Sequence, residues 1–208
     1  MIIPGLPRAI GGSGEPDRIT YSRLTGEDDV FYVPEEVNPG DVIVAAVANN
    51  GDTPDTPSGF TRTTTFSSTE NSGRITIFTK TADGNEGTVS CSGSRAAVCV
   101  VIEGAFQLDG GVENAGDSAN VEISNVDGVE FGVEIWIAFA SGYWGSGERT
   151  VVEFPDGFND DFGAQKSNNS NHLIMFAVDL TGTQIHADKQ FTLSDPVGWC
   201  SVIEGYSR

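Results

Sequence analysis

Short apolar runs separated by Gly, Pro, Asn and Asp make up most of this chain. Residues 42–48 form a continuous apolar run, which is typical of a strand buried on both faces. Residues 74–80 and 130–139 alternate apolar and polar side chains, which indicates strands with one face on a core. Because these runs are short and bounded by turn residues, the sequence predicts an all-β fold, a jelly-roll-like antiparallel β-sandwich.

The remaining strands are predicted by the same reasoning. Residues 88–91 and 96–102 flank a turn, and residues 19–24 and 29–33 are short runs that we expect to pair with each other. Later strands are expected at residues 120–123, 150–154, 172–180, 191–193 and 197–206. The total is about ten to twelve strands, against eight in a minimal jelly roll. We see no fixed-period repeat, which disfavours propellers and solenoids.

The first 17 residues differ from the rest of the 208-residue chain. Their apolar residues are spaced by Pro and Gly and lead into the flexible run Gly11-Gly12-Ser13-Gly14. We therefore predict an extended N-terminal arm at residues 1–17 and a single sandwich domain at residues 18–208. The arm is expected to dock on a neighbouring subunit; a tail without fixed structure and an arm packed on its own domain are the alternatives. The interface residues of a docking arm would be Ile2, Ile3, Leu6, Arg8 and Ile10.

Charge limits the partners that this chain is expected to bind. It has 11 basic and 30 acidic residues, a net charge of -19, and a pI near 4.1. Such a surface repels phosphate backbones and anionic headgroups, so we expect neither nucleic-acid nor membrane binding. Solubility alone is a sufficient reason for the acidity. The start of the chain does not resemble a secretory signal, and no run has the roughly 20 apolar residues of a transmembrane helix.

The residues that could perform chemistry are few and lack the spacing that chemistry needs. Cys91, Cys99 and Cys200 include no Cys-x-x-Cys pair and are expected to be free thiols, with a Cys91 to Cys99 bridge as the alternative. His172 and His186 are the two histidines and are expected to be structural or surface residues. No Gly-x-Ser-x-Gly motif accompanies them. We therefore predict no catalytic residues and no metal site.

Two acidic arrangements need separate consideration. Glu130 and Glu134 share a strand face with Trp136, but they lack the spacing of jelly-roll glycosidases, so a solvent-facing pair is the better interpretation. The loop at residues 156–163 contains several carboxylate and amide side chains without the EF-hand spacing. We expect no cofactor, and a structural calcium ion in this loop is the one alternative considered.

The loop at residues 141–147 is the candidate binding loop. Its two adjacent aromatic residues, Tyr143 and Trp144, are flanked by Gly and Ser. Exposed aromatic side chains on a flexible loop suit stacking on a sugar or packing against another protein. Aromatic side chains folded back over their own sheet are the alternative.

Residues 40–105 carry a resemblance to a known family. They contain Gly-Asp before an aliphatic strand, Pro-Ser-Gly-Phe-Thr, an alternating strand, Ala-Asp-Gly, and a strand pair ending in Val-Ile-Glu-Gly-Ala. This order resembles the jelly-roll domains of structural proteins from tailed bacteriophages. The motif consists of turn and core residues, so it is more specific for the fold than for the role.

The resemblance implies a non-enzymatic virion protein. We expect a capsid decoration, or cement, protein that binds the major capsid protein on the outer surface of the phage head. It would act as a homotrimer, be made in the host cytoplasm, and stabilise the head. The alternative is a receptor- or carbohydrate-binding module of a tail or head fibre. A glycoside hydrolase or lyase is a third class, which would need two carboxylates across a cleft.

Overall fold

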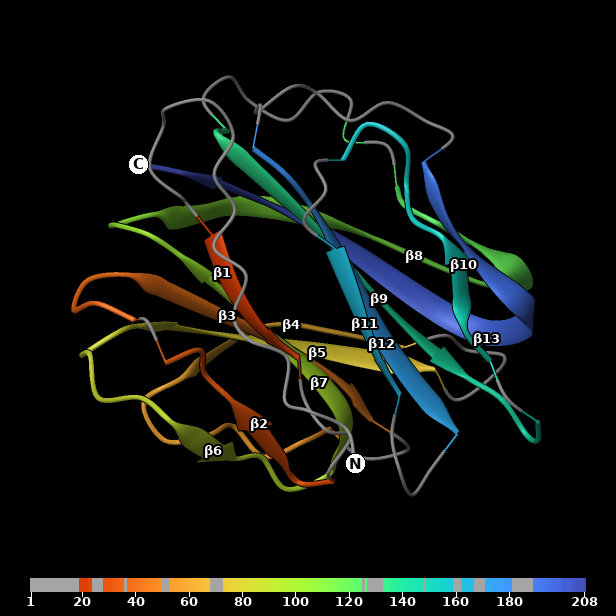
Figure 1. Ribbon diagram of the computed structural model, residues 1–208, viewed down its shortest axis with the longest axis horizontal. Helices are drawn as coiled ribbons and strands as arrows, with labels where there is room; N and C mark the ends of the chain where they lie inside the picture. The colour runs from red at the N-terminus through yellow and green to blue at the C-terminus, as the bar shows by residue number, and fades with distance from the viewer. Residues whose placement is uncertain are drawn as a thin grey trace.

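The structure, a computed structural model, describes residues 19–23, 28–35, 37–49, 53–67, 73–124, 126, 133–147, 149–158, 162–166, 171–180 and 189–208. All regular structure in these ranges is β, with 13 strands, no helix and antiparallel pairing throughout (Figure 1). This confirms the all-β prediction. The predicted arm, with Ile2, Ile3, Leu6, Arg8 and Ile10, lies outside the described residues.

The first sheet is built from the N-terminal half of the chain. Its five strands lie in the order β1-β7-β3-β5-β4. Their bounds are Ile19–Arg23 (β1), Val42–Asn49 (β3), Thr61–Ser67 (β4), Arg74–Thr81 (β5) and Ser94–Ile102 (β7). A separate pair, β2 (Val30–Tyr32) with β6 (Thr88–Ser90), covers part of its outer face. The expected pairing of residues 19–24 with 29–33 is therefore wrong, because β1 pairs with β7 and β2 with β6.

The second sheet is built from the C-terminal half, in the order β8-β13-β9-β12-β11, with β10 also paired to β13. The bounds are Gln107–Glu122 (β8), Ile135–Tyr143 (β9), Val151–Glu153 (β10), Phe162–Lys166 (β11), His172–Asp179 (β12) and Gln190–Ser207 (β13). β13 is one continuous strand where the sequence predicted two. Residues 193–196 lie opposite the single residue Ala119, and β13 bends sharply there (Figure 1).

The two sheets have the same strand order. If the strands of each sheet are numbered in chain order and β10 is left aside, both sheets run first, last, second, fourth, third from one edge to the other. A Pro-x-Gly-Phe turn recurs after the second strand, at residues 57–60 and 155–158. Gly59 and Gly157 have φ angles of 80° and 81°, and in both turns the Phe N–H donates to the Pro carbonyl. The two halves therefore share one architecture, although the sequence shows no obvious repeat.

The sheets pack face to face through one apolar cluster. It combines Val44, Ile77 and Val98 of the first sheet with Phe139 and Phe176 of the second. The central strands of both sheets are also buried on their outer faces, so Val42–Asn49 (β3) and His172–Asp179 (β12) are buried along their whole length. Burial on both faces explains why these strands form continuous or nearly continuous apolar runs rather than alternating ones.

β8 is the long edge strand of the second sheet, and its edge is partly capped. The Asn114 side chain accepts a hydrogen bond from the Ala115 N–H at 2.9 Å, and the Ser124 hydroxyl donates to the Glu113 carbonyl at 3.1 Å. These local bonds satisfy backbone groups that would otherwise attract another chain. Only residues 120–123 of this strand are predicted from the sequence, because Gly, Asp and Asn are frequent in the rest.

Candidate functional site

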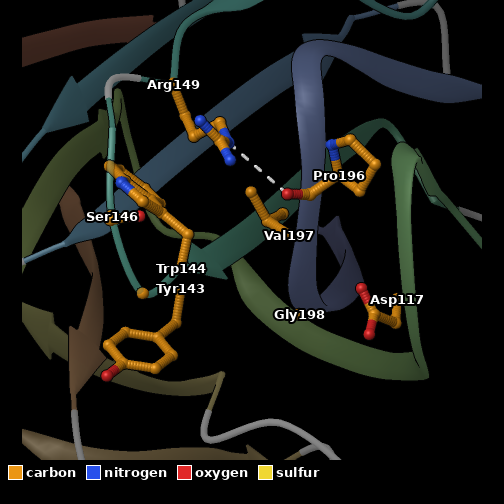
Figure 2. Close-up of a pocket in the computed structure, with 9 residues that line it drawn as sticks. Asp117, Tyr143, Trp144, Ser146, Arg149, Pro196, Val197 and Gly198 are labelled. Atoms are coloured by element: carbon orange, nitrogen blue, oxygen red, sulfur yellow. Dashed lines mark hydrogen bonds between the residues drawn. The ribbon is translucent and has the colours of Figure 1, made fainter.

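The candidate site is a hollow of about 300 Å³ where β13 bends past the end of β9. It is lined by Asp117 of β8, by the segment from Tyr143 to Arg149, and by the bend in β13 (Figure 2). The lining residues are Asp117, Tyr143, Trp144, Gly145, Ser146, Arg149, Pro196, Val197 and Gly198. The predicted binding loop therefore does line a concave surface.

The two aromatic residues of this loop behave differently. Trp144 is 4% exposed, packs in the outer apolar cluster of the second sheet, and donates from Nε1 to the Gly147 carbonyl at 2.8 Å. Tyr143 is half-buried, and its ring lies 4.8 Å from the His172 ring. In Figure 2 the Tyr143 ring points away from Arg149. The two rings therefore do not form a shared stacking platform, and Trp144 mainly stabilises its own sheet.

The charges of the hollow come from residues that sequence analysis did not identify. Arg149 Nη1 lies 3.5 Å from an Asp195 carboxylate oxygen, and its Nε donates to the Pro196 carbonyl at 3.4 Å. Asp117 adds a second carboxylate. These residues come from three separate segments, and no local sequence pattern marks them as neighbours. The lining itself holds one guanidinium and one carboxylate, Arg149 and Asp117, and Asp195 pairs with Arg149 outside it. This balance of charge suits a neutral ligand rich in hydroxyl groups better than an anion.

A second polar cluster is buried between the sheets. The Glu204 side chain on β13 is fully buried and accepts a hydrogen bond from the Tyr206 hydroxyl at 2.6 Å. The hydroxyls of Thr64 and Thr63 on β4 lie 3.3 and 3.4 Å from its other oxygen. Burial raises the pKa of Glu204, and these hydrogen bonds oppose the rise. The cluster joins the edge of the first sheet to the second and is closed to ligands.

The cysteines are all free and buried, as predicted, and the alternative Cys91 to Cys99 bridge is absent. Burial raises the pKa of the Cys91 and Cys200 thiols to about 12, and that of Cys99 further. Deprotonation of these thiols near neutral pH is therefore strongly disfavoured. They behave as small apolar side chains and offer no nucleophile.

The histidines and carboxylates give no catalytic arrangement in the described ranges. His172 is 1% exposed, and burial lowers its pKa to about 4. His186 and Glu130 lie outside the described residues, while Glu134 lies 3.7 Å from Arg208 in an ion pair. Trp136 is buried on the outer face of the second sheet.

Metal ligands do not cluster where the structure can be described. No group of three or more His, Cys, Asp or Glu side chains there could hold a metal ion. Of the acidic loop considered for calcium, residues 156–158 form the Pro-x-Gly-Phe turn and residues 159–161 lie outside the described ranges. A calcium ion in this loop therefore stays an alternative prediction. No helix of the described chain is long and apolar enough to cross a membrane.

The motif residues of the family resemblance have structural tasks. The Asp41 carboxylate accepts the Asn38 and Gly104 N–H groups, each at 2.8 Å, and so ties the turn before β3 to the turn after β7. In the Ala82-Asp83-Gly84 turn, the Glu86 carboxylate accepts the N–H groups of residues 83 and 84 and contacts Lys80 at 3.0 Å. These residues shape turns and carry no reaction chemistry.

Comparison with known proteins gives no relative. No protein-family model matches the chain, and no similar curated protein or solved structure was found. The function is therefore inferred from the residues themselves and from the resemblance carried by residues 40–105.

Proposed function

We propose that this chain is a non-enzymatic virion structural protein of a tailed bacteriophage, a decoration protein that binds the outer surface of the head. Its partners would be the major capsid protein and two further copies of itself. The observation that carries the proposal is the placement of residues 40–105. They supply four of the five strands of one sheet, and their motif residues form its turns and core. The resemblance therefore covers most of one sheet rather than scattered positions.

The jelly-roll assignment is part of this proposal. Two antiparallel sheets packed through one core support a two-layered β architecture. Each sheet comes from one half of the chain, with the crossing between β7 and β8. The proposed role as a decoration protein therefore depends on the two layers and the motif residues and would hold with a different strand connectivity.

The mechanism of a decoration protein is thermodynamic linkage. A protein that binds only the assembled lattice lowers the free energy of that state, so the lattice resists rupture by packaged DNA. Such a protein needs a stable core and a binding surface but no reactive groups. The acidic composition would keep unbound copies soluble and apart from nucleic acid.

The test is the copy number and location of the protein on purified particles, measured by cryo-electron microscopy. Many copies at symmetry positions of the head, with a higher rupture temperature than in particles lacking the protein, would support decoration. A few copies at the tail would favour a receptor-binding module. Absence from the particle would contradict both assignments.

The hollow lined by Arg149 and Asp117 favours a second candidate, the carbohydrate-binding module of a tail or head fibre. Its donors and acceptors suit the hydroxyl groups of a neutral sugar. Screening the intact protein on a glycan array, with Arg149→Ala and Asp117→Ala as comparisons, tests this candidate. Binding that both variants lose would support it, and the absence of binding on a broad array would remove it.

A further inference from the structure

The face of β8 that points toward the first sheet is not covered by that sheet. In an antiparallel pair, residues directly opposite each other point to the same face. Cys200, Val202, Glu204 and Tyr206 of β13 are at most 1% exposed and lie opposite Ala115, Glu113, Gly111 and Leu108 of β8. Leu108 is 37% exposed, Gly111 and Glu113 are exposed, and Ala115 is half-buried. The first sheet therefore covers β13 but ends before β8, and we call these four β8 residues the ledge.

The strand beside the ledge is β4, the edge of the first sheet. The Thr64 hydroxyl contacts Glu204, and the Cys200 thiol lies 3.8 Å from the Phe66 carbonyl. β4 therefore lies over β13 between the levels of Gly111 and Ala115. Within the described residues, no strand pairs with the outer edge of β4. Because strands in both sheets are about 4.8 Å apart, one more strand beside β4 would lie over the ledge.

The chemistry of the ledge defines what could occupy it. Leu108, Gly111 and Ala115 offer apolar or small surface, and Glu113 places one carboxylate among them. β8 contains four acidic residues and no basic one. Partial burial raises the pKa of Glu113, so its charged form is already disfavoured there and a cation would stabilise it. An extended segment with apolar residues on either side of one basic residue would complement this surface.

We propose that residues 5–10 of a second copy of this chain bind as an added strand along the free edge of β4, over the ledge. Residues 1–10 lie outside the described ranges, but their sequence fits the requirement. In an extended segment Leu6, Arg8 and Ile10 share one face, and no acidic residue precedes Glu15. Arg8 would then meet Glu113, with Leu6 and Ile10 over Ala115 and Gly111.

Pro7 is compatible with this arrangement. Along a strand, the side-chain face and the direction of the backbone N–H alternate together. With Leu6, Arg8 and Ile10 on the ledge, one strand direction points their N–H groups at β4 and the Pro7 nitrogen at solvent. The proline then removes no interstrand hydrogen bond. A proline on the outer side also prevents a further strand from adding there.

A second copy is favoured over the chain's own arm by the order of the strands. Residues 1–18 join the first sheet at β1, which is the edge opposite β4, so the chain's own arm would have to cross the whole width of the sheet to reach β4. An arm passed from each copy to the next is a head-to-tail contact, which closes into a ring when the rotation permits. This inference rests on the self-association in the proposed function and names the surfaces that would produce it.

The test is a charge exchange between the two surfaces in the full chain. The mass of the wild type, Arg8→Glu, Glu113→Arg and the double variant is measured by analytical ultracentrifugation over a range of concentrations. Each single variant should weaken association roughly tenfold, and the double variant should restore most of it. Glu122→Arg on the same strand, away from the ledge, is the matched control and should associate like the wild type. Hydrogen exchange should show β4 amides that lose protection when residues 1–10 are deleted.

Three results would overturn the inference. They are a wild type that is monomeric at every concentration, single variants that associate normally, and a double variant no better than the singles. A monomer whose β4 amides lose protection on deletion would place the arm on its own domain instead. Occupancy on phage heads is measured in a separate experiment. A protein that occupies the heads but shows no exchange of arms would refute this inference and leave the proposed function intact.

Discussion

The buried carboxyl of Glu204 should make this protein lose stability as the pH rises, and Glu204→Gln should remove that loss. Glu204 is fully buried, and its pKa is raised mainly by desolvation. A carboxyl whose pKa is higher in the folded state binds a proton more readily there than in the unfolded chain. Its stabilising contribution is therefore complete below the unfolded pKa, near 4.3, and is lost as the pH rises through the folded pKa.

The magnitude follows from one titrating group. Within that pH window the free energy of unfolding falls by at most about 1.4 kcal/mol per pH unit. The glutamine amide keeps an acceptor for the Tyr206 hydroxyl, and its NH₂ can donate to the Thr63 and Thr64 hydroxyls. Glu204→Gln should therefore lie within about 1 kcal/mol of the wild type at pH 4 and be the more stable of the two at pH 8. Glu204→Ala should cost about 2–4 kcal/mol, because it opens a cavity and leaves the Tyr206 hydroxyl without its acceptor.

The assay is urea denaturation followed by tryptophan fluorescence between pH 4 and pH 8. Exposed carboxylates contribute equally to the wild type and the variant, so the difference in the free energy of unfolding isolates Glu204. A difference that stays constant over the whole range would refute the raised pKa. A wild type that loses stability relative to Glu204→Gln as the pH falls would show that the sign of the shift is wrong.

Three further outcomes are expected. Gly116→Ala should destabilise the protein by about 1–3 kcal/mol in thermal denaturation, because the added Cβ would lie 2.6 Å from the buried Trp199 indole. In Gly110→Ala, on the same strand, the added Cβ meets no atom within 4 Å, so this control should be nearly neutral. Asp41→Ala should lower the free energy of unfolding by about 1–3 kcal/mol, since it leaves two backbone N–H groups of adjoining turns without their acceptor. Asp41→Asn should keep part of the lost stability, and equal stability of the wild type and both variants would contradict the role of Asp41 in joining the turns. The three thiols should react with iodoacetamide only after unfolding, as followed by mass spectrometry, and rapid labelling of the native protein would contradict their burial.

Part of the candidate site could be predicted from the sequence, and part could not. The pattern of small residues around two aromatics correctly drew attention to Tyr143 and Trp144, which line the hollow. It could not reveal that Trp144 is 4% exposed, since an aromatic in a Gly-rich loop is compatible with either environment. Arg149 and Asp117 come together only because β13 bends between residues 193 and 197, and that bend has no local signature.

The sequence by itself determined the local structure of this protein. Turn residues at fixed places and apolar runs such as residues 42–48 and 172–179 specify short strands, because Gly, Pro and Asp set the backbone where the chain reverses and burial requires apolar side chains. Tertiary structure alone decided which strands pair and which polar strands exist. Most of Gln107–Glu122 has little strand propensity and is held by β13, while Thr61–Ser67 contains strand-favouring threonines but no apolar run and pairs with β5. Pairing energy depends on partners distant in sequence, so neither the shared strand order of the two sheets nor the uncovered ledge can be deduced from local pattern.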